Sequence, residues 1–301
     1  MGAGLSCFKG NTASRGMIDS TASEEDKFDP RKQGYNPYAV GIATMEDGIP
    51  VPKSTILLPL YVYPNPGAWA PLQQMIAAYP NVSFTVIINP FNGPGLDDLP
   101  DANYQREIPR LTCHANVKVV GYVHTAWAKR DLALVVKDIE KYAQWPECSG
   151  LPDLKISGVF VDETPNVYDA EAEAYLAKLW KHVKTMPAGD ENVVIHNPGC
   201  VPDAAFLKLA DSTVIFEDTY NTFQTRVANA IFSATALSMV DRSKLACVIH
   251  SIPKDLKGEE WRRLGQQARK IAGDLFMTEL CEHYYANFAP KWVEFVHAMA
   301  A

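Results

Sequence analysis

The sequence predicts an α/β fold, a single (β/α)₈ barrel of the TIM type that follows a flexible N-terminal tail. Short β-branched or aliphatic runs recur from residue 56 onward, and stretches with helical periodicity separate them. Successive runs start roughly every 30 residues, which is the length of one βα unit. The alternative, a doubly wound open sheet, usually has a Gly-rich phosphate turn after its first strand. That turn here is residues 63–67, Tyr-Pro-Asn-Pro-Gly, which lacks the GxGxxG pattern.

Each predicted element has a definite place in the chain. Eight runs bounded by turn residues are expected to be the strands: Ile56–Tyr61, Val82–Ile88, Val117–Val123, Ile156–Val161, Val193–Ile195, Val214–Phe216, Cys247–Ile249 and Leu275–Met277. Apolar residues at helical spacing predict helices within 69–79, 132–142, 172–183, 227–232, 256–271 and 292–299. Asp131 is placed as an N-cap.

Residues 1–50 are predicted to be the tail and residues 51–301 the barrel domain. The segment 11–34 is rich in Ser, Thr, Lys and acids, so it cannot bury enough apolar surface to offset the entropy of ordering. Gly2 followed by Ser6 fits N-myristoylation, and Cys7 beside them is a candidate for palmitoylation. Two acyl chains would attach the protein peripherally to a membrane. The alternative is a chance match in a tail of small residues.

No run of signal-peptide or membrane-spanning length is found in the sequence. We therefore expect a cytoplasmic protein or one anchored at the cytoplasmic face, with unconventional export as the alternative. The net charge of −7 and the absence of a basic stripe exclude a nucleic-acid partner. The six cysteines form no CxxC pair and are expected to be reduced, with a Cys113–Cys148 bridge left open.

Acidic residues directly follow two apolar strands, at the end where barrel enzymes place their catalytic groups. Val-Phe-Val runs into Asp162 and Glu163, and Val-Ile-Phe runs into Glu217 and Asp218. Burying a carboxylate at a strand end is costly without partners, so Asp162, Glu163 and Glu217 are the candidate catalytic residues. Asp218 and Glu279 are interpreted as surface loop acids.

Several carboxylates without a nucleophilic Ser or Cys motif favour glycoside hydrolysis. Crowded carboxylates push their pKa values apart, so one can stay protonated near neutral pH. Side chains alternate along a strand, but the Thr-Pro that follows Glu163 suggests that the strand has ended and that both acids reach the rim. One hypothesis is substrate-assisted hydrolysis of a 2-acetamido sugar, in which Asp162 orients the acetamide and Glu163 protonates the leaving group.

Other strand-end residues are expected to bind the sugar. Aromatic rings stack on sugar faces, amides bond hydroxyls, and histidines pair with an acid or a sugar. The predicted substrate-binding residues are Tyr61, Tyr63, Asn89, Tyr122, His124, Trp127, His196, Asn197, Tyr220 and His250.

An alternative use of three of these residues is a metal site. His124, His196 and His250 follow the third, fifth and seventh strands, and a bound metal could activate water. Barrel metallohydrolases of the amidohydrolase kind carry His-x-His on the first strand, where this chain has Tyr-Val-Tyr. We therefore expect no metal and no cofactor.

Several segments together resemble the spherulin-4 (spherulation-specific) family, from about Ile56 to Thr278. They are Leu-Pro-Leu-Tyr-Val-Tyr-Pro at 58–64, Ile-Ile-Asn-Pro at 87–90, Val-Gly-Tyr-Val-His-Thr at 120–125, Gly-Val-Phe-Val-Asp-Glu at 158–163, His-Asn-Pro-Gly at 196–199 and Phe-Glu at 216–217. The resemblance implies a (β/α)₈ glycoside hydrolase of family 135. The family's acids fall on Asp162, Glu163 and Glu217.

Characterised members of that family cleave galactosamine-containing polysaccharide in fungi, within N-acetylgalactosamine regions and outside the cell. The expected function is therefore an endo-acting glycoside hydrolase on such a polymer. Two alternatives stay open: a non-catalytic carbohydrate-binding or spore- or stage-specific structural protein, and a metal-dependent barrel hydrolase.

Overall fold

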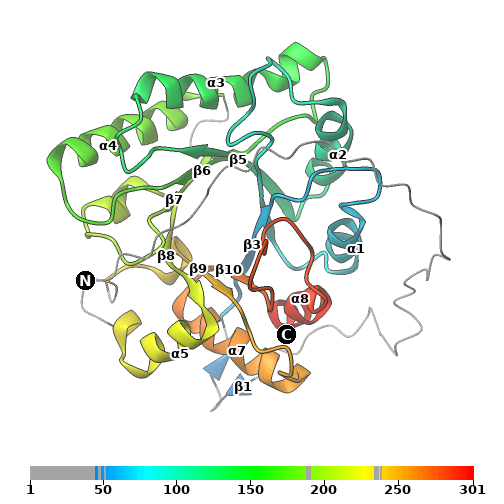
Figure 1. The fold of residues 1–301 in the computed structure, drawn as a ribbon, viewed down its shortest axis with the longest axis vertical. Coiled ribbons are helices and arrows are strands. Elements are labelled where there is room, and N and C mark those ends of the chain that lie inside the picture. Colours follow the sequence, from blue (N-terminus) through cyan, green and yellow to red (C-terminus); the bar gives the residue numbers. More distant parts are fainter. Residues whose placement is uncertain (1–44, 47–48, 51, 188–190, 234–236, 238) are drawn as a thin grey trace. The chain divides into compact units, whose positions relative to one another are not determined.

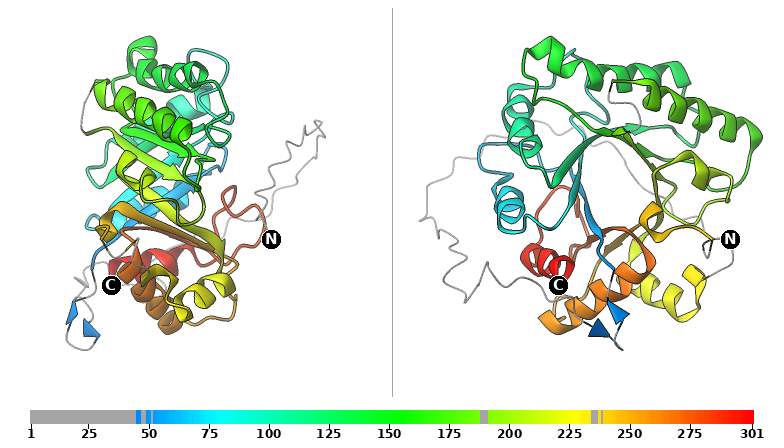
Figure 2. Two further views of the ribbon diagram at one scale, coloured as in Figure 1. Left: turned by 90° about the vertical axis from the view of Figure 1, so that its left-hand side faces the viewer. Right: turned by 180° about the vertical axis from the view of Figure 1, so that it is seen from behind.

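Eight parallel strands close into a barrel in the order β10-β3-β4-β5-β6-β7-β8-β9. In the computed structural model, helices lie around the outside of this ring of strands (Figures 1 and 2). The prediction of a (β/α)₈ barrel is confirmed. The structure describes residues 45–46, 49–50, 52–187, 191–233, 237 and 239–301. Gly2 and Cys7, the predicted acylation sites, lie outside the described residues, so their acylation stays a prediction.

The strands of the barrel are β3 (Thr55–Leu60), β4 (Phe84–Ile88), β5 (Val117–His124), β6 (Gly158–Asp162), β7 (Val193–Asn197), β8 (Ser212–Thr219), β9 (Leu245–His250) and β10 (Asp274–Met277). The helices are α1 (Ala70–Ala78), α2 (Ala102–Thr112), α3 (Leu132–Ser149), α4 (Ala170–Thr185), α5 (Tyr220–Ala228), α7 (Gly258–Ile271) and α8 (Trp292–Ala300). Short 3₁₀ turns are η3 (Phe206–Leu209), η4 (Ile231–Ser233) and η5 (Arg242–Lys244). Before the barrel, within the predicted tail, β1 (Met45–Glu46) and β2 (Ile49–Pro50) form an antiparallel pair.

One strand differs from its predicted length in a way that matters for the site. The run expected at Val214–Phe216 is part of β8, which continues to Thr219. A bulge shifts the register, because Val214 pairs with Ala246 while Phe216 pairs with the next residue of β9. A bulge of this kind changes which residues face inward beyond it. Glu217 therefore lies inside a paired strand, not beyond its end.

Helix α2 is absent from the sequence prediction. Its buried side chains include Glu107, so a charged residue interrupts the apolar stripe, and Pro109 lies within the helix. Arg106 and Arg110 pair with the Glu107 carboxylate at 2.7 and 3.1 Å, and Gln73 donates to it at 3.0 Å. The helix predicted across 227–232 is also wrong in extent: α5 ends at Ala228.

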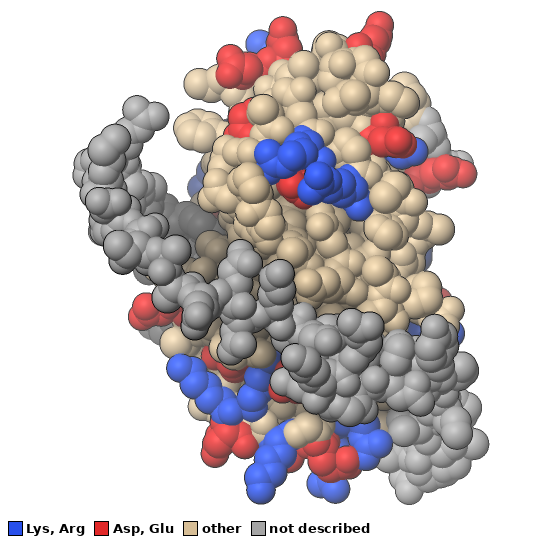
Figure 3. Space-filling model, turned by 90° about the vertical axis from the view of Figure 1, so that its right-hand side faces the viewer, with Lys and Arg blue, Asp and Glu red and all other residues tan. Residues whose placement is uncertain are grey.

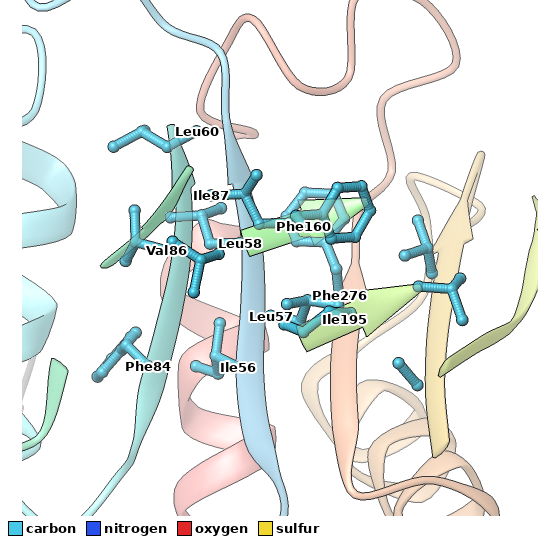
Figure 4. Packing of buried hydrophobic residues seen from close by; sticks show 14 of the residues in the cluster. Ile56, Leu57, Leu58, Leu60, Phe84, Val86, Ile87, Phe160, Ile195 and Phe276 are labelled. Atoms are coloured by element: carbon cyan, nitrogen blue, oxygen red, sulfur yellow. The ribbon is translucent and has the colours of Figure 1, made fainter. Parts of the chain in front are cut away.

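The strands separate two apolar layers. Leu57, Phe160, Ile195 and Phe276 gather inside the barrel, and Figure 4 shows them close together. Residues that alternate with them face the helices. On that outer side Gly121 admits the ring of Tyr142, since an added Cβ would lie 2.6 Å from it. The polar residues at the strand ends lie next to this interior apolar layer, at one end of the barrel.

The described surface carries mixed charge. On the face in Figure 3, basic side chains lie among acidic ones and form no continuous basic area in the part of the chain that is described. Within the same residues, no helix combines the length and the hydropathy needed to cross a bilayer. The described cysteines are Cys113, Cys148, Cys200, Cys247 and Cys281, and all are free. The Cys113–Cys148 bridge is thus not present.

Candidate active site

The end of β6 brings two acids to the rim by a change of backbone conformation. The strand ends at Asp162, and Glu163 adopts a left-handed conformation with φ 54°. Such a φ is uncommon for a residue with a Cβ. Because Glu163 leaves the strand geometry, its side chain need not point opposite to that of Asp162. The interpretation that the strand ends before Thr164 agrees with this geometry.

An amide bridge joins the acids of two strands. Asn197, the last residue of β7, donates through Nδ2 to Asp162 Oδ1 at 2.9 Å and to Glu217 Oε2 at 2.7 Å. Tyr122 on β5 donates its hydroxyl to Asp162 Oδ2 at 2.8 Å. Tyr285 donates to Glu217 Oε1 at 2.5 Å. Each oxygen of this partly buried carboxylate pair, Asp162 and Glu217, accepts at least one hydrogen bond from a neutral donor.

Burial, and then the charge of Glu217, raises the pKa of Asp162 to about 7, against hydrogen bonds that lower it. No cation is among the causes of this shift, so the pair keeps its mutual repulsion. Asp162 is therefore close to half protonated at neutral pH. A carboxylate whose pKa is raised by burial and by a neighbouring negative charge is typical of acid–base sites.

Glu163 has a different environment. Its side chain is 30% exposed, and its Oε2 lies 3.6 Å from His124 Nδ1. Burial, and then the charge of Arg130, lowers the pKa of His124, while Glu163 raises it. The main chain of Glu163 is held by buried Thr125, whose hydroxyl donates to Glu163 O at 2.8 Å. The side chain of this acid is therefore partly exposed to solvent, and its main chain is held by a hydrogen bond.

Aromatic rings lie beside the carboxylate pair. Tyr61 packs edge-on against Tyr122 and Tyr285, with ring centroids 5.9 and 5.4 Å apart. Burial is the largest cause that raises the pKa of Tyr61, followed by the charge of Asp162. Tyr285 comes from the loop between β10 and α8, eight residues beyond the strand end at Met277, and the strand-end analysis did not include it. Its neighbour Tyr284 stacks on His250 at 4.5 Å.

Other predicted substrate-binding residues lie on the rim but outside this cluster. Tyr63 is exposed and bonds Asp101 and Asn103 at the start of α2. Asn89 Oδ1 accepts from Gly93 N, which closes the loop after β4. Trp127 is 53% exposed in the loop after β5. Tyr220 is the first residue of α5 and is partly buried.

His196 is a wrong prediction. Its neighbour Asn197 points into the barrel mouth, so His196 points to the opposite face of the sheet. The side chain is buried, its Nε2 has no hydrogen-bond partner, and burial lowers its pKa to about 4. His196 is thus a neutral core residue behind the barrel wall.

The three histidines considered as metal ligands are not brought together among the described residues. His196 faces away from the rim, while His250 bonds Ser251 Oγ through Nδ1 at 2.9 Å and stacks on a tyrosine. Among the described residues, no group of three His, Cys, Asp or Glu side chains is arranged to hold a metal ion.

Glu279 is not the surface acid that the sequence suggested. It is 4% exposed, and its Oε1 accepts from the backbone N of Lys291 at 2.7 Å, just before α8. Its Oε2 is buried without a partner. The carboxylate thereby ties both ends of the loop that carries Tyr285.

The model of spherulation-specific family 4 matches residues 55–299, which is nearly the whole barrel. The chain belongs to this family. Spherulin-4 of Physarum polycephalum is 34% identical over 198 residues, which are 65% of this chain and 55% of the relative. The chain therefore spans about half the length of that family member.

Two solved structures are similar to this spherulin-4 family chain. Sph3 of Aspergillus clavatus, in complex with GalNAc, is 48% identical with a TM-score of 0.80, over 83% of this chain and 98% of Sph3. The endo-1,4-beta-mannanase of Rhizomucor miehei is 9% identical with a TM-score of 0.56, over 85% of this chain and 96% of the mannanase. The second likeness is one of fold alone.

Proposed function

We propose that this protein hydrolyses glycosidic bonds in a polysaccharide that contains N-acetylgalactosamine. The observation that carries the proposal is the set of three carboxylates at one end of the barrel, with Asp162 and Glu217 bridged by Asn197 and Glu163 beside them. A glycoside hydrolase needs one acid for the leaving oxygen and one ionised group for the cation that develops on the sugar. The GalNAc held by Sph3, at 48% identity, supports the choice of sugar.

The environments of the acids suggest their roles. The Glu163 side chain is 30% exposed, so it can protonate the leaving oxygen and regain its proton from water. Asp162 is fixed by two hydrogen bonds, which suits a group that orients the acetamide of the sugar. In this scheme the Glu163 proton passes to the leaving oxygen as the glycosidic C–O bond breaks, and positive charge develops on the sugar ring. Water then adds to the anomeric carbon and gives a proton back to the Glu163 carboxylate.

Glu217 completes the scheme as a source of negative charge. Glu217 lies within one amide of Asp162, so its negative charge would stabilise positive charge that develops on a sugar ring beside the pair. Tyr285 and Asn197 fix its two oxygens, so the charge does not need to reorganise during the reaction. The donors are neutral, so the negative charge of Glu217 is not cancelled by a neighbouring cation.

The test is release of reducing ends from α-1,4-linked galactosamine and N-acetylgalactosamine polymers. Wild type should release them, Glu163→Gln should not, and Glu140→Gln, which makes the same change on the exposed face of α3, should behave as wild type. If Asp162 holds the acetamide of the sugar, the fully acetylated polymer should be cut and the fully deacetylated polymer should not. If folded wild type binds these polymers without cutting any of them, the barrel is a carbohydrate-binding protein and not a hydrolase.

A further inference from the structure

Three consecutive residues in the loop after β5 adopt left-handed backbone conformations. They are Ala126, Trp127 and Ala128, with φ values of 48°, 56° and 61°. Residues with a Cβ avoid this region, and when they occur there it is usually singly. A run of three is a strained segment, and strain of this kind persists where the surrounding structure enforces it.

Hydrogen bonds to the neighbouring strand enforce this turn. Trp127 N donates to Glu163 O at 2.7 Å, and Thr125 N donates to Asp162 O at 3.1 Å. Arg130 N returns to Thr125 O at 3.0 Å, which closes the turn. The main chain of the turn is therefore fixed to the main chain of the two acids that end β6.

The turn presents an indole to solvent. Trp127 is 53% exposed, whereas Trp69, Trp145, Trp261 and Trp292 are buried and Trp180 is partly buried. Ala128 beside it packs against α4 and η3. Within the described part of the chain, no aromatic ring packs against the Trp127 indole. A simple connection between strand and helix would need neither the strain nor an exposed tryptophan.

The strand order shows on which side of the site this turn lies. In the barrel, β5 lies on one side of β6, while β7 and β8, which carry Asn197 and Glu217, lie on the other. In strand order, Glu163 at the end of β6 thus lies between Trp127 after β5 and Glu217 on β8. A sugar over the pair would have its glycosidic oxygen at Glu163 and its leaving group on the Trp127 side.

We infer that Trp127 is the stacking platform for the sugar ring on the leaving-group side of the scissile bond. This inference rests on the proposed function and specifies how that site takes a polymer. Flat aromatic faces bind the apolar faces of pyranose rings. The neighbouring loops, after β4 and β6, expose Phe91 and Tyr168, so the occupant is an oligosaccharide and not one ring.

The inference can be tested with the tryptophan itself as the probe. In a Glu163→Gln background, N-acetylgalactosamine oligosaccharides of two to eight units should change the protein fluorescence. Trp127→Phe should abolish that change but retain affinity within about threefold, because it keeps a flat ring. Trp127→Ala should lose about tenfold or more in affinity. Trp180→Phe, on the helical layer, should retain both the signal and the affinity.

Wild-type affinity in Trp127→Ala, a fluorescence change that persists in Trp127→Phe, or no binding by any oligosaccharide would overturn the inference. Its failure is separable from failure of the proposed function. If Trp127→Ala cuts the polymer with an unchanged KM, Trp127 is not a stacking platform, but the protein is still a hydrolase. If oligosaccharides bind at Trp127 but wild type does not cleave them, the protein is not a hydrolase, but Trp127 is still a stacking platform.

Discussion

Replacing Glu217 by Gln tests the electrostatic coupling between Asp162 and Glu217. Asn197 Nδ2 lies 2.9 Å from Asp162 Oδ1 and 2.7 Å from Glu217 Oε2, so these two oxygens are within about 5.6 Å of each other. At that distance, with an effective dielectric constant of about 20, two unit charges repel by about 3 kcal/mol. One pKa unit corresponds to about 1.4 kcal/mol. The pKa of Asp162 should therefore fall from about 7 to about 5 in the variant.

The assay is a carbon NMR titration of the carboxyl groups, with Asp162 assigned by its absence in Asp162→Asn. The Gln amide can still offer its oxygen to Asn197, because the Tyr285 hydroxyl can turn to accept from the new NH₂. The hydrogen bonds are thus retained while the charge is removed. An Asp162 pKa that stays near 7 in the variant would refute the coupling and leave burial as the whole cause.

The same pKa sets a pH dependence of stability. The pKa of Asp162 is raised on folding, so its contribution to stability is full below about pH 4 and is lost as the pH rises through about 7. Urea midpoints of wild type should fall over this range relative to those of Asp162→Asn. Parallel curves for the two proteins would contradict the raised pKa.

Three further substitutions probe the parts that support the site. Tyr285→Phe removes a charge-assisted hydrogen bond worth about 1.5–3 kcal/mol, so kcat on the polymer should fall about tenfold or more; an unchanged kcat would show that the hydroxyl has no role. Glu279→Ala leaves Lys291 N without its acceptor and should cost about 1–3 kcal/mol in urea unfolding, with lower activity because the loop between β10 and α8 loosens. Ala126→Gly should stabilise the fold by about 0.5–1 kcal/mol, because glycine adopts φ 48° without strain, while Ala174→Gly, on the exposed side of α4, should destabilise it by a similar amount. Destabilisation by both glycine variants would argue against strain in the loop after β5.

The barrel and the positions of three acids at its rim could be predicted from local pattern. Eight apolar runs at regular spacing specify the fold, and Asp162 with Glu163 follows an apolar run that a Thr-Pro pair ends. Glu217 was identified by its place after Phe216, although the β8 bulge that shifts its register leaves no mark in the sequence.

The residues that sequence analysis misassigned or overlooked share a cause. Position in the sequence does not determine the direction of a side chain or the course of a loop. His196 is polar and next to a strand end, yet the two-residue period of the strand points it into the helical layer. Tyr285 reaches Glu217 from the middle of a long loop, whose course depends on Glu279. The only signal for that loop was its aromatic content, His-Tyr-Tyr-Ala-Asn-Phe at 283–288.

Cleavage of polymer in ¹⁸O-labelled water is the most direct test of hydrolysis by the carboxylate cluster. Wild type should release oligosaccharides that each carry one ¹⁸O at the new reducing end, as mass spectrometry would show. Glu163→Gln should release none while it still binds the polymer. Products without ¹⁸O, or equal release by the variant, would contradict hydrolysis with Glu163 as the acid.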